Sequence, residues 1–310
     1  MTETIYNLFL MYQDGVCSQV RYVTHETDKG DQEALDFLLG RVAVDLNNSK
    51  IINLTRPFDK AEHDARTRLG HGQILWDEVY QILGAGDQPL SVVTPVVNGI
   101  PQVTFRAQLG DPNIYLREDM TQGVEMDDWI LKYRKDDGLD LSQLIHDDYF
   151  EAIKITFNAK LHVSAMKLLL SAIDSLAYIE FGDTANVFIK WMDAYADLKP
   201  LGITSEELWE LRNGLLHMTN LDSRAVTKKK VRRISFHVGA KLFYERDGIH
   251  YFGFFELLME VARAHARWLE TYNSNPEKRV EFVSRYDQTI SDTRVARYGS
   301  APPPHGQAIS

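Results

Sequence analysis

Apolar residues follow two different spacings in the first half of the chain. Four segments rich in β-branched and aromatic side chains predict strands, at residues 5–12, 91–97, 102–108 and 113–118. Two longer segments, residues 31–47 and 61–83, carry apolar side chains three and four positions apart and predict helices. The first half is therefore expected to be an α+β domain.

The chain changes character after a polar, turn-prone run at residues 135–140. Beyond this run, helical spacing of apolar side chains predicts a series of helices over residues 141–157, 159–181, 184–198, 206–217, 255–272 and 276–297. The turn at residues 246–248 lies between two aromatic, β-branched segments and predicts a small β-hairpin insert. We therefore expect an α+β domain at 1–138, an all-α helical bundle at 139–298 and a disordered, proline-containing tail at 299–310.

Composition narrows the class of protein. With 310 residues, 44% of them hydrophobic and 25% charged, the chain has the composition of a soluble globular protein. No segment has the roughly 18 apolar residues that a membrane span needs, and the N-terminus lacks the layout of a secretion signal. We therefore expect a cytoplasmic protein that does not act in a membrane.

The negative charge is unevenly distributed. Residues 1–140 hold 23 acidic and 13 basic side chains, whereas residues 141–310 hold 21 of each, and the net charge is −10. This excess of acid argues against broad nucleic-acid binding by the first half. It also suggests the hypothesis that the acidic first half inhibits the activity of the helical second half.

The sequence lacks the common cofactor and metal motifs. It contains no glycine-rich phosphate loop, no His-Glu-x-x-His and no Gly-x-Ser-x-Gly. The single cysteine, Cys17, excludes an internal disulfide and a site with several thiolate ligands. We expect neither a cofactor nor a metal.

The most informative segment is the predicted helix at 206–217. Thr204 and Glu207 have the spacing of a capping box, so the helix should begin at Ser205. Near its end lie Arg212, Asn213 and His217. On an α-helix, Asn213 and His217 share one face, whereas Arg212 points about 140° away from His217.

These three side chains together suit phosphodiester cleavage without a metal. The imidazole of His217 titrates near neutral pH and could move a proton to or from a ribose or leaving oxygen. The guanidinium of Arg212 could hold the non-bridging phosphate oxygens in the transition state. Asn213 could position the phosphate or the imidazole.

The phrase Leu208-Trp209-Glu210-Leu211-Arg212-Asn213-Gly214-Leu215-Leu216-His217, on a late helix of a helical bundle, resembles the motif of the HEPN superfamily. The resemblance covers approximately residues 141–275. It implies a metal-independent endoribonuclease that acts on RNA, commonly as a homodimer, in toxin–antitoxin systems or antiphage defence. It also makes Asp174, on the long second helix, a candidate site residue.

Structural interpretations compete with these functional ones. His217 could cap the end of its helix, Arg212 could pair with Glu206, Glu207 or an acid of another helix, and Asp174 could pair with Lys154 or Lys167.

The basic run downstream could be a solvated loop or could bind RNA phosphates through Lys228, Lys229, Lys230, Arg232 and Arg233. The alternative function is a catalytically inactive module for dimerisation or RNA binding that serves a partner protein.

Overall fold

The structure is a computed structural model and describes residues 2–86, 89–101, 113–114, 124–127, 129–135, 138–218, 223–239, 242–273, 275–290 and 296–298. The chain divides into two compact units. The first contains Met1–Gly138 together with Asp292–Ser310, and the second contains Leu139–Ser291. The predicted strand at 102–108, most of the one at 113–118 and the predicted tail lie outside the described residues.

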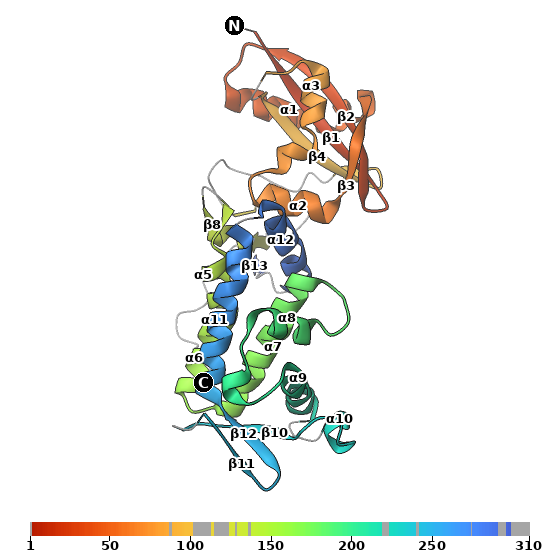
Figure 1. Ribbon diagram of the computed structural model, residues 1–310. Coiled ribbons are helices and arrows are strands. Elements are labelled where there is room, and N and C mark those ends of the chain that lie inside the picture. The colour runs from red at the N-terminus through yellow and green to blue at the C-terminus, as the bar shows by residue number, and fades with distance from the viewer. Residues whose placement is uncertain are drawn as a thin grey trace. The chain divides into compact units, whose positions relative to one another are not determined.

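The first unit is an α/β unit built on a five-stranded sheet with the strand order β3-β2-β1-β4-β5 (Figure 1). Its strands are β1 (Glu3–Gln13), β2 (Val16–Thr27), β3 (Lys50–Asp59), β4 (Ser91–Val97) and β5 (Ile100–Pro101). The central strand β1 runs antiparallel to β2 and parallel to β4. The predicted strands at 5–12 and 91–97 are confirmed as β1 and β4.

Helices supply apolar side chains to both faces of this sheet. On one face, α1 (Asp31–Asn48) packs Ala34, Leu38 and Val42 against Ile5 and Phe9 of β1. On the other, a core forms around residues of β1 and the segment before β4, including Tyr6, Leu8, Leu10, Trp76 and Val79. A strand buried on both faces has few polar positions, which explains why β1 was predicted from a nearly continuous apolar run.

The predicted helix at 61–83 is interrupted. The segment instead forms α2 (Lys60–Arg68), the 3-10 helix η1 (Gly72–Leu75) and α3 (Asp77–Leu83). Gly70 has a φ of +82°, a left-handed conformation that ends an α-helix and that glycine adopts without strain. The apolar spacing on the two sides of this break is compatible with one helix, but the backbone at Gly70 is not.

Short elements complete the first unit. They are β6 (Asn113–Ile114), β7 (Val124–Asp127), η2 (Trp129–Tyr133), β8 (Arg134–Lys135) and β13 (Ala296–Tyr298), while β9 (Gly138–Leu139) includes the first residue of the second unit. Strand β13 pairs antiparallel with β7, so residues 296–298 belong to a small sheet of the first unit. The helix predicted at 276–297 therefore ends earlier, at Ile290.

The second unit consists mainly of helices. They are α5 (Leu141–Ile145), the π-helical turn η3 (His146–Phe150), α6 (Glu151–Asn158), α7 (His162–Phe181), α8 (Val187–Tyr195), η4 (Lys199–Leu201), α9 (Ser205–Asn213), the π-helical turn η5 (Gly214–Met218), α10 (Arg224–Thr227), α11 (Phe254–Asn273) and α12 (Pro276–Ile290). Helix α7 contacts α6, α8, α9 and α12, and its apolar stripe at Met166, Leu169, Ile173 and Leu176 is buried. The sequence prediction of a helical second half is confirmed.

A small sheet lies between α10 and α11 in the chain. The strands β10 (Ile234–His237), β12 (Ile249–Gly253) and β11 (Phe243–Arg246) pair in that order. Asp247 and Gly248 form the turn between β11 and β12, and both have positive φ angles, as a type I′ hairpin turn requires. The predicted hairpin is confirmed, and β10 extends it to three strands.

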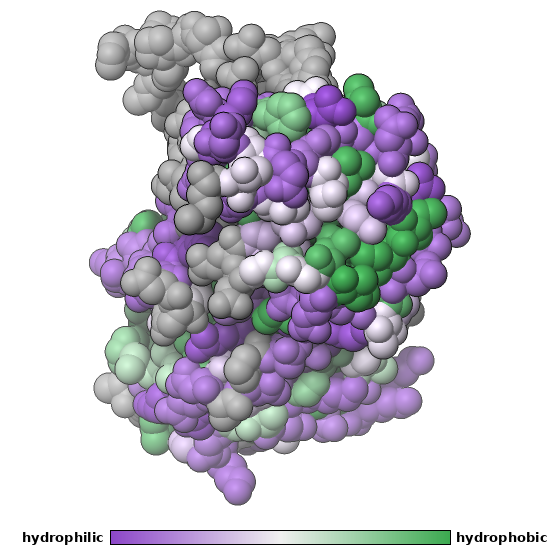
Figure 2. Space-filling view, turned by 90° about the horizontal axis from the view of Figure 1, so that it is seen from above, coloured by the Kyte–Doolittle hydropathy of each residue, from purple (hydrophilic) through white to green (hydrophobic). Residues whose placement is uncertain are grey.

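The view in Figure 2 shows a mostly hydrophilic face on which apolar residues gather in one area. Exposed apolar side chains of the first unit include Phe37, Leu39, Ile51 and Ile82. No helix in the described part of the chain is long and apolar enough to cross a membrane.

Candidate functional site

The helix that carries the Arg-Asn-x3-His motif begins as predicted. The Thr204 hydroxyl accepts a hydrogen bond from the Glu207 amide at 3.2 Å, and the Glu207 carboxylate accepts one from the Thr204 amide at 2.9 Å. This reciprocal pair is a complete capping box and fixes the start of α9 at Ser205. The capping box therefore sets the position of Arg212 and Asn213 in the last turn of α9.

The end of the motif helix differs from the prediction. Instead of a continuous α-helix to His217, α9 ends at Asn213 and a π-helical turn follows over Gly214–Met218. A π-helical turn is closed by hydrogen bonds between residues five apart and contains more residues than an α-helical turn. Residues five apart, such as Arg212 and His217, therefore lie closer to the same face than on an α-helix.

The structure brings the three motif residues together. Arg212 donates from Nη1 to the Asn213 side-chain oxygen at 3.1 Å, and the same nitrogen lies 3.4 Å from Nε2 of His217. A guanidinium can only donate hydrogen bonds, so it can donate to Nε2 of His217 in the tautomer that carries its proton on Nδ1. The imidazole of His217 therefore lies directly beside a fixed positive charge.

Asp174 joins the same cluster. Its carboxylate forms an ion pair with Nη2 of Arg212, so its partner is the motif arginine, while Lys154 pairs with Glu151 at 3.3 Å. Burial raises the pKa of the Asp174 carboxyl above its ordinary value, and the charges of Arg212 and His217 oppose this shift. An acid on α7 thus connects the motif helix to the core helix of the unit.

The four side chains differ in exposure. Arg212 and Asp174 are 19% and 23% exposed and Asn213 is half-buried, whereas His217 is exposed. The Nε of Arg212 is buried and has no hydrogen-bond partner among the described residues. The imidazole of the cluster is therefore accessible to solvent, whereas the guanidinium beside it is largely buried and is paired with Asp174.

Trp209 is a residue of this site that sequence reasoning missed. The guanidinium of Arg212 lies over its indole ring, 4.9 Å from the ring centroid. The indole in turn packs against the buried Phe188 of α8, with 5.4 Å between ring centroids. The signal was present in the sequence, because residues three apart on a helix are neighbours.

The basic run after the motif divides into two parts. Lys228, Lys229 and Lys230 are exposed. Arg232 instead donates to both carboxylate oxygens of Glu207, at 2.9 and 3.1 Å, and thereby attaches the start of β10 to the capping box of α9. Arg232 therefore has a structural role in the second unit, and the half-buried Arg233 follows it.

The described residues include no group of three or more His, Cys, Asp or Glu side chains that could hold a metal ion. Comparisons of the chain with models of protein families, with curated proteins and with solved structures gave no match.

Proposed function

We propose that the second unit is a HEPN-type endoribonuclease, with Arg212 and His217 at its active site. The observation that carries this proposal is the 3.4 Å contact between the Arg212 guanidinium and Nε2 of the exposed His217. The resemblance of the motif to HEPN proteins supports the same conclusion from the sequence. Both lines of support depend on the same two side chains.

The reaction is an internal transesterification. The ribose 2′-oxygen forms a bond to phosphorus, the bond between phosphorus and the 5′-oxygen breaks, and the products carry 2′,3′-cyclic phosphate and 5′-hydroxyl ends. His217 accepts the proton of the 2′-hydroxyl at a ring nitrogen of its exposed imidazole. The leaving 5′-oxygen must gain a proton in the same reaction.

Arg212 stabilises the negative charge that develops on the non-bridging oxygens. Asp174 and Trp209 act through Arg212 as positioning residues, because they contact its guanidinium from two sides. A planar guanidinium can leave one edge for a phosphate while another edge pairs with a carboxylate. Asn213 contacts the same guanidinium through its side-chain oxygen.

A second copy of the chain would supply the proton for the leaving oxygen. One imidazole serves one proton transfer at a time, whereas two motifs that meet in a homodimer provide a base and an acid. This arrangement follows from the resemblance to HEPN proteins and belongs to the proposal. Lys228, Lys229 and Lys230 are exposed on the same unit and would bind the RNA backbone.

A cleavage assay tests the proposal. The purified full chain, with a labelled single-stranded RNA in buffer containing EDTA, should produce fragments with 2′,3′-cyclic phosphate ends. His217→Ala and Arg212→Ala should each lower the rate by about 100-fold or more, because each removes a group that acts in the transition state. Their far-UV circular dichroism should match that of the wild type.

Matched variants exclude a general effect of removing charge. His146→Ala removes another exposed imidazole of the same unit, which lies 3.2 Å from Glu151, and Arg246→Ala removes an exposed guanidinium at the hairpin. Both should cleave at the wild-type rate. Equal cleavage by the wild type and His217→Ala would overturn the proposed site, and RNA binding without cleavage would favour the inactive module.

A further inference from the structure

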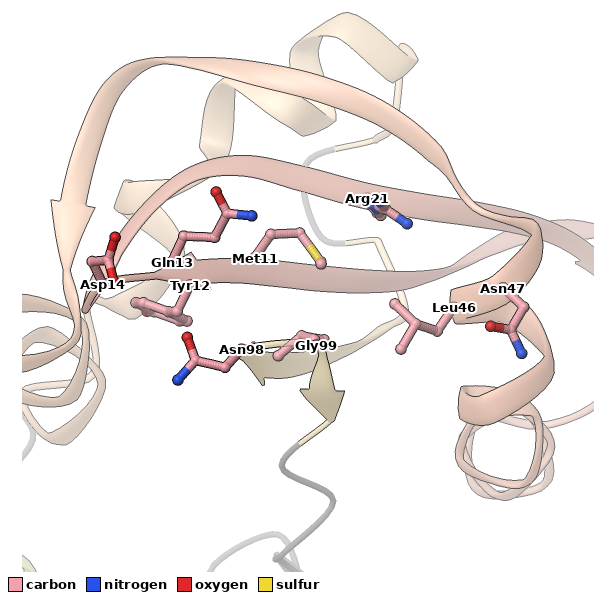
Figure 3. Close-up of a pocket in the computed structure, with 10 residues that line it drawn as sticks. Met11, Tyr12, Gln13, Asp14, Arg21, Leu46, Asn47, Asn98 and Gly99 are labelled. Carbon is pink, nitrogen blue, oxygen red and sulfur yellow. The ribbon is translucent and has the colours of Figure 1, made fainter.

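A pocket in the first unit has features of a ligand site that is separate from the proposed nuclease. It has a volume of about 580 Å³ and lies at the end of the sheet where β1 and β4 finish (Figure 3). Side chains of Met11, Leu46 and Val96 provide an apolar part of its wall. A pocket of this volume falls in the range of small-molecule sites, about 300–1,000 Å³.

Two tight turns support the rim of the pocket. Asp14 and Gly15 connect β1 to β2, and Asn98 and Gly99 connect β4 to β5, all with positive φ angles. These are the angles of type I′ hairpin turns, which allow little backbone variation. The Asn98 amide donates to the carbonyl of Tyr12 at 3.2 Å, so the second turn is attached directly to β1.

Arg21 is the only cation among the residues that line this pocket. Its Nε is buried and has no hydrogen-bond partner among the described residues. Its sheet neighbours in register are Phe9 on β1 and Ile51 on β3, neither of which has a side chain that can accept a hydrogen bond. Neither of these neighbours therefore supplies an acceptor for the buried Nε.

The buried carboxylate on the same face of the sheet, that of Asp45, already has hydrogen-bond partners of its own. Asp45 of α1 accepts hydrogen bonds from Asn7 at 2.8 Å, from Arg41 at 3.2 Å, and lies 2.7 Å from Nε2 of His25. Asp14, which also lines the pocket, is drawn at the opposite end from Arg21 in Figure 3. By contrast, Arg41, Arg56 and Arg66 of the same unit each pair with a carboxylate.

We propose that this pocket binds a small organic anion, whose carboxylate or phosphate group pairs with Arg21 and whose apolar body lies on Met11, Leu46 and Val96. The guanidinium offers donors in the planar arrangement that both kinds of anionic group match. The side chains of Gln13, Asn47 and Asn98 at the rim add polar groups that suit an oxygen-rich ligand. The proposal is independent of the function proposed for the second unit.

The test uses the methyl group of Met11 as a local probe. The full chain, with its eight methionines labelled at the ¹³C-methyl position, is titrated with phenyl phosphate, with benzoate and with the neutral benzyl alcohol. The Met11 resonance is assigned with Met11→Leu. At least one of the two anions should shift it, with a dissociation constant of about 1–10 mM, as expected for fragments of this size.

Substitution of Arg21 gives the decisive comparison. Arg21→Gln should weaken binding of the anion by about tenfold or more, since a hydrogen bond to a charged group is lost. Arg21→Lys, which keeps the charge but not the planar donors, should retain part of the affinity. The matched control is Arg56→Gln, an exposed arginine of β3 that pairs with Glu62, and it should bind as the wild type does.

Each result has a defined meaning. Binding of only one anion identifies the acidic group that the pocket selects. The proposal is overturned if neither anion shifts Met11 at 10 mM, if benzyl alcohol binds as well as the anions, or if Arg21→Gln keeps the wild-type affinity. Arg21→Lys retains the charge and provides a check on folding. If its thermal midpoint matches that of the wild type while its affinity for the anion is lower, the loss of affinity reports a change in the site and not a loss of folding.

Discussion

Replacing Glu180 with glutamine should destabilise the second unit strongly at neutral pH. The carboxylate of Glu180, on α7, accepts hydrogen bonds from Lys278 at 2.8 Å, from Tyr195 at 2.9 Å and from the Trp268 indole at 2.7 Å. The side chains of Glu180 and Lys278 are only 10% and 16% exposed. One carboxylate thus connects α7 to the end of α8 and to helices α11 and α12.

The magnitude follows from this burial. Glu180→Gln keeps the size of the side chain but removes the charge and turns one acceptor into a donor that faces other donors. Removing one partner of a buried, hydrogen-bonded ion pair typically costs about 3–5 kcal/mol. We expect a loss in this range in the free energy of unfolding at pH 7.

The pH dependence of this loss is also defined. Burial alone would raise the pKa of Glu180, but hydrogen bonds from Lys278, Trp268 and Tyr195 lower it below the ordinary value. The carboxylate therefore contributes its full stability above the pKa of an unfolded glutamate, and this contribution disappears as the pH falls through the lower folded pKa. The difference between wild type and Glu180→Gln should shrink in acid.

Urea unfolding followed by circular dichroism, from pH 7 down to pH 3, measures the difference. Hydrogen exchange of α7, α11 and α12 assigns it to the second unit. Glu281→Gln is the matched control, because Glu281 is 60% exposed and pairs with Arg285 at 3.3 Å, and it should stay within about 0.5 kcal/mol of the wild type. The reasoning fails if Glu180→Gln is as stable as this control, or if its deficit persists unchanged in acid.

Two further predictions concern single side chains. Thr204→Ala should cost about 1 kcal/mol, because it removes the hydroxyl that caps α9, and should speed hydrogen exchange at the start of that helix; unchanged exchange would contradict the role of the cap. Cys17 should resist a disulfide reagent at pH 7 in the native chain and react after unfolding in guanidinium. Burial raises the pKa of its thiol to about 11, so rapid labelling of the native protein would contradict its position in the core.

Local signals in the sequence were sufficient for several elements. The capping box fixed the start of α9, and the apolar runs identified β1 and β4. The type I′ turn at Asp247 and Gly248 identified the hairpin. In each case the signal lies within a few residues of the element that it predicts, and the local preference agrees with the fold.

Other elements depend on partners far away in the chain. Strand β2 was not predicted, because its face toward α1 carries Gln19, Arg21 and His25 in place of apolar residues. Pairing with β1 and β3 stabilises it instead. Strand β13 likewise forms by pairing with β7, which comes more than 160 residues earlier in the chain.

The candidate site was partly predictable. The motif residues and Asp174 were identified from spacing and from the resemblance, but the helical wheel placed Arg212 away from His217. The π-helical turn at Gly214–Met218 brings the two side chains together, and no residue type in this segment predicts such a turn. Leu215 within this turn is buried in the core of the second unit, a contact that spacing along the helix does not reveal.

The parallel pairing of β1 with β4 has a consequence for biosynthesis. Within this sheet β1 is translated before its neighbours and occupies the centre, and its second neighbour, β4, is complete only when residue 97 has been translated. Until then one edge of a long apolar strand has unsatisfied amides and carbonyls, the situation that invites pairing with another chain. Nascent molecules should therefore rely on chaperones more during this interval than while the helices of the second unit are made.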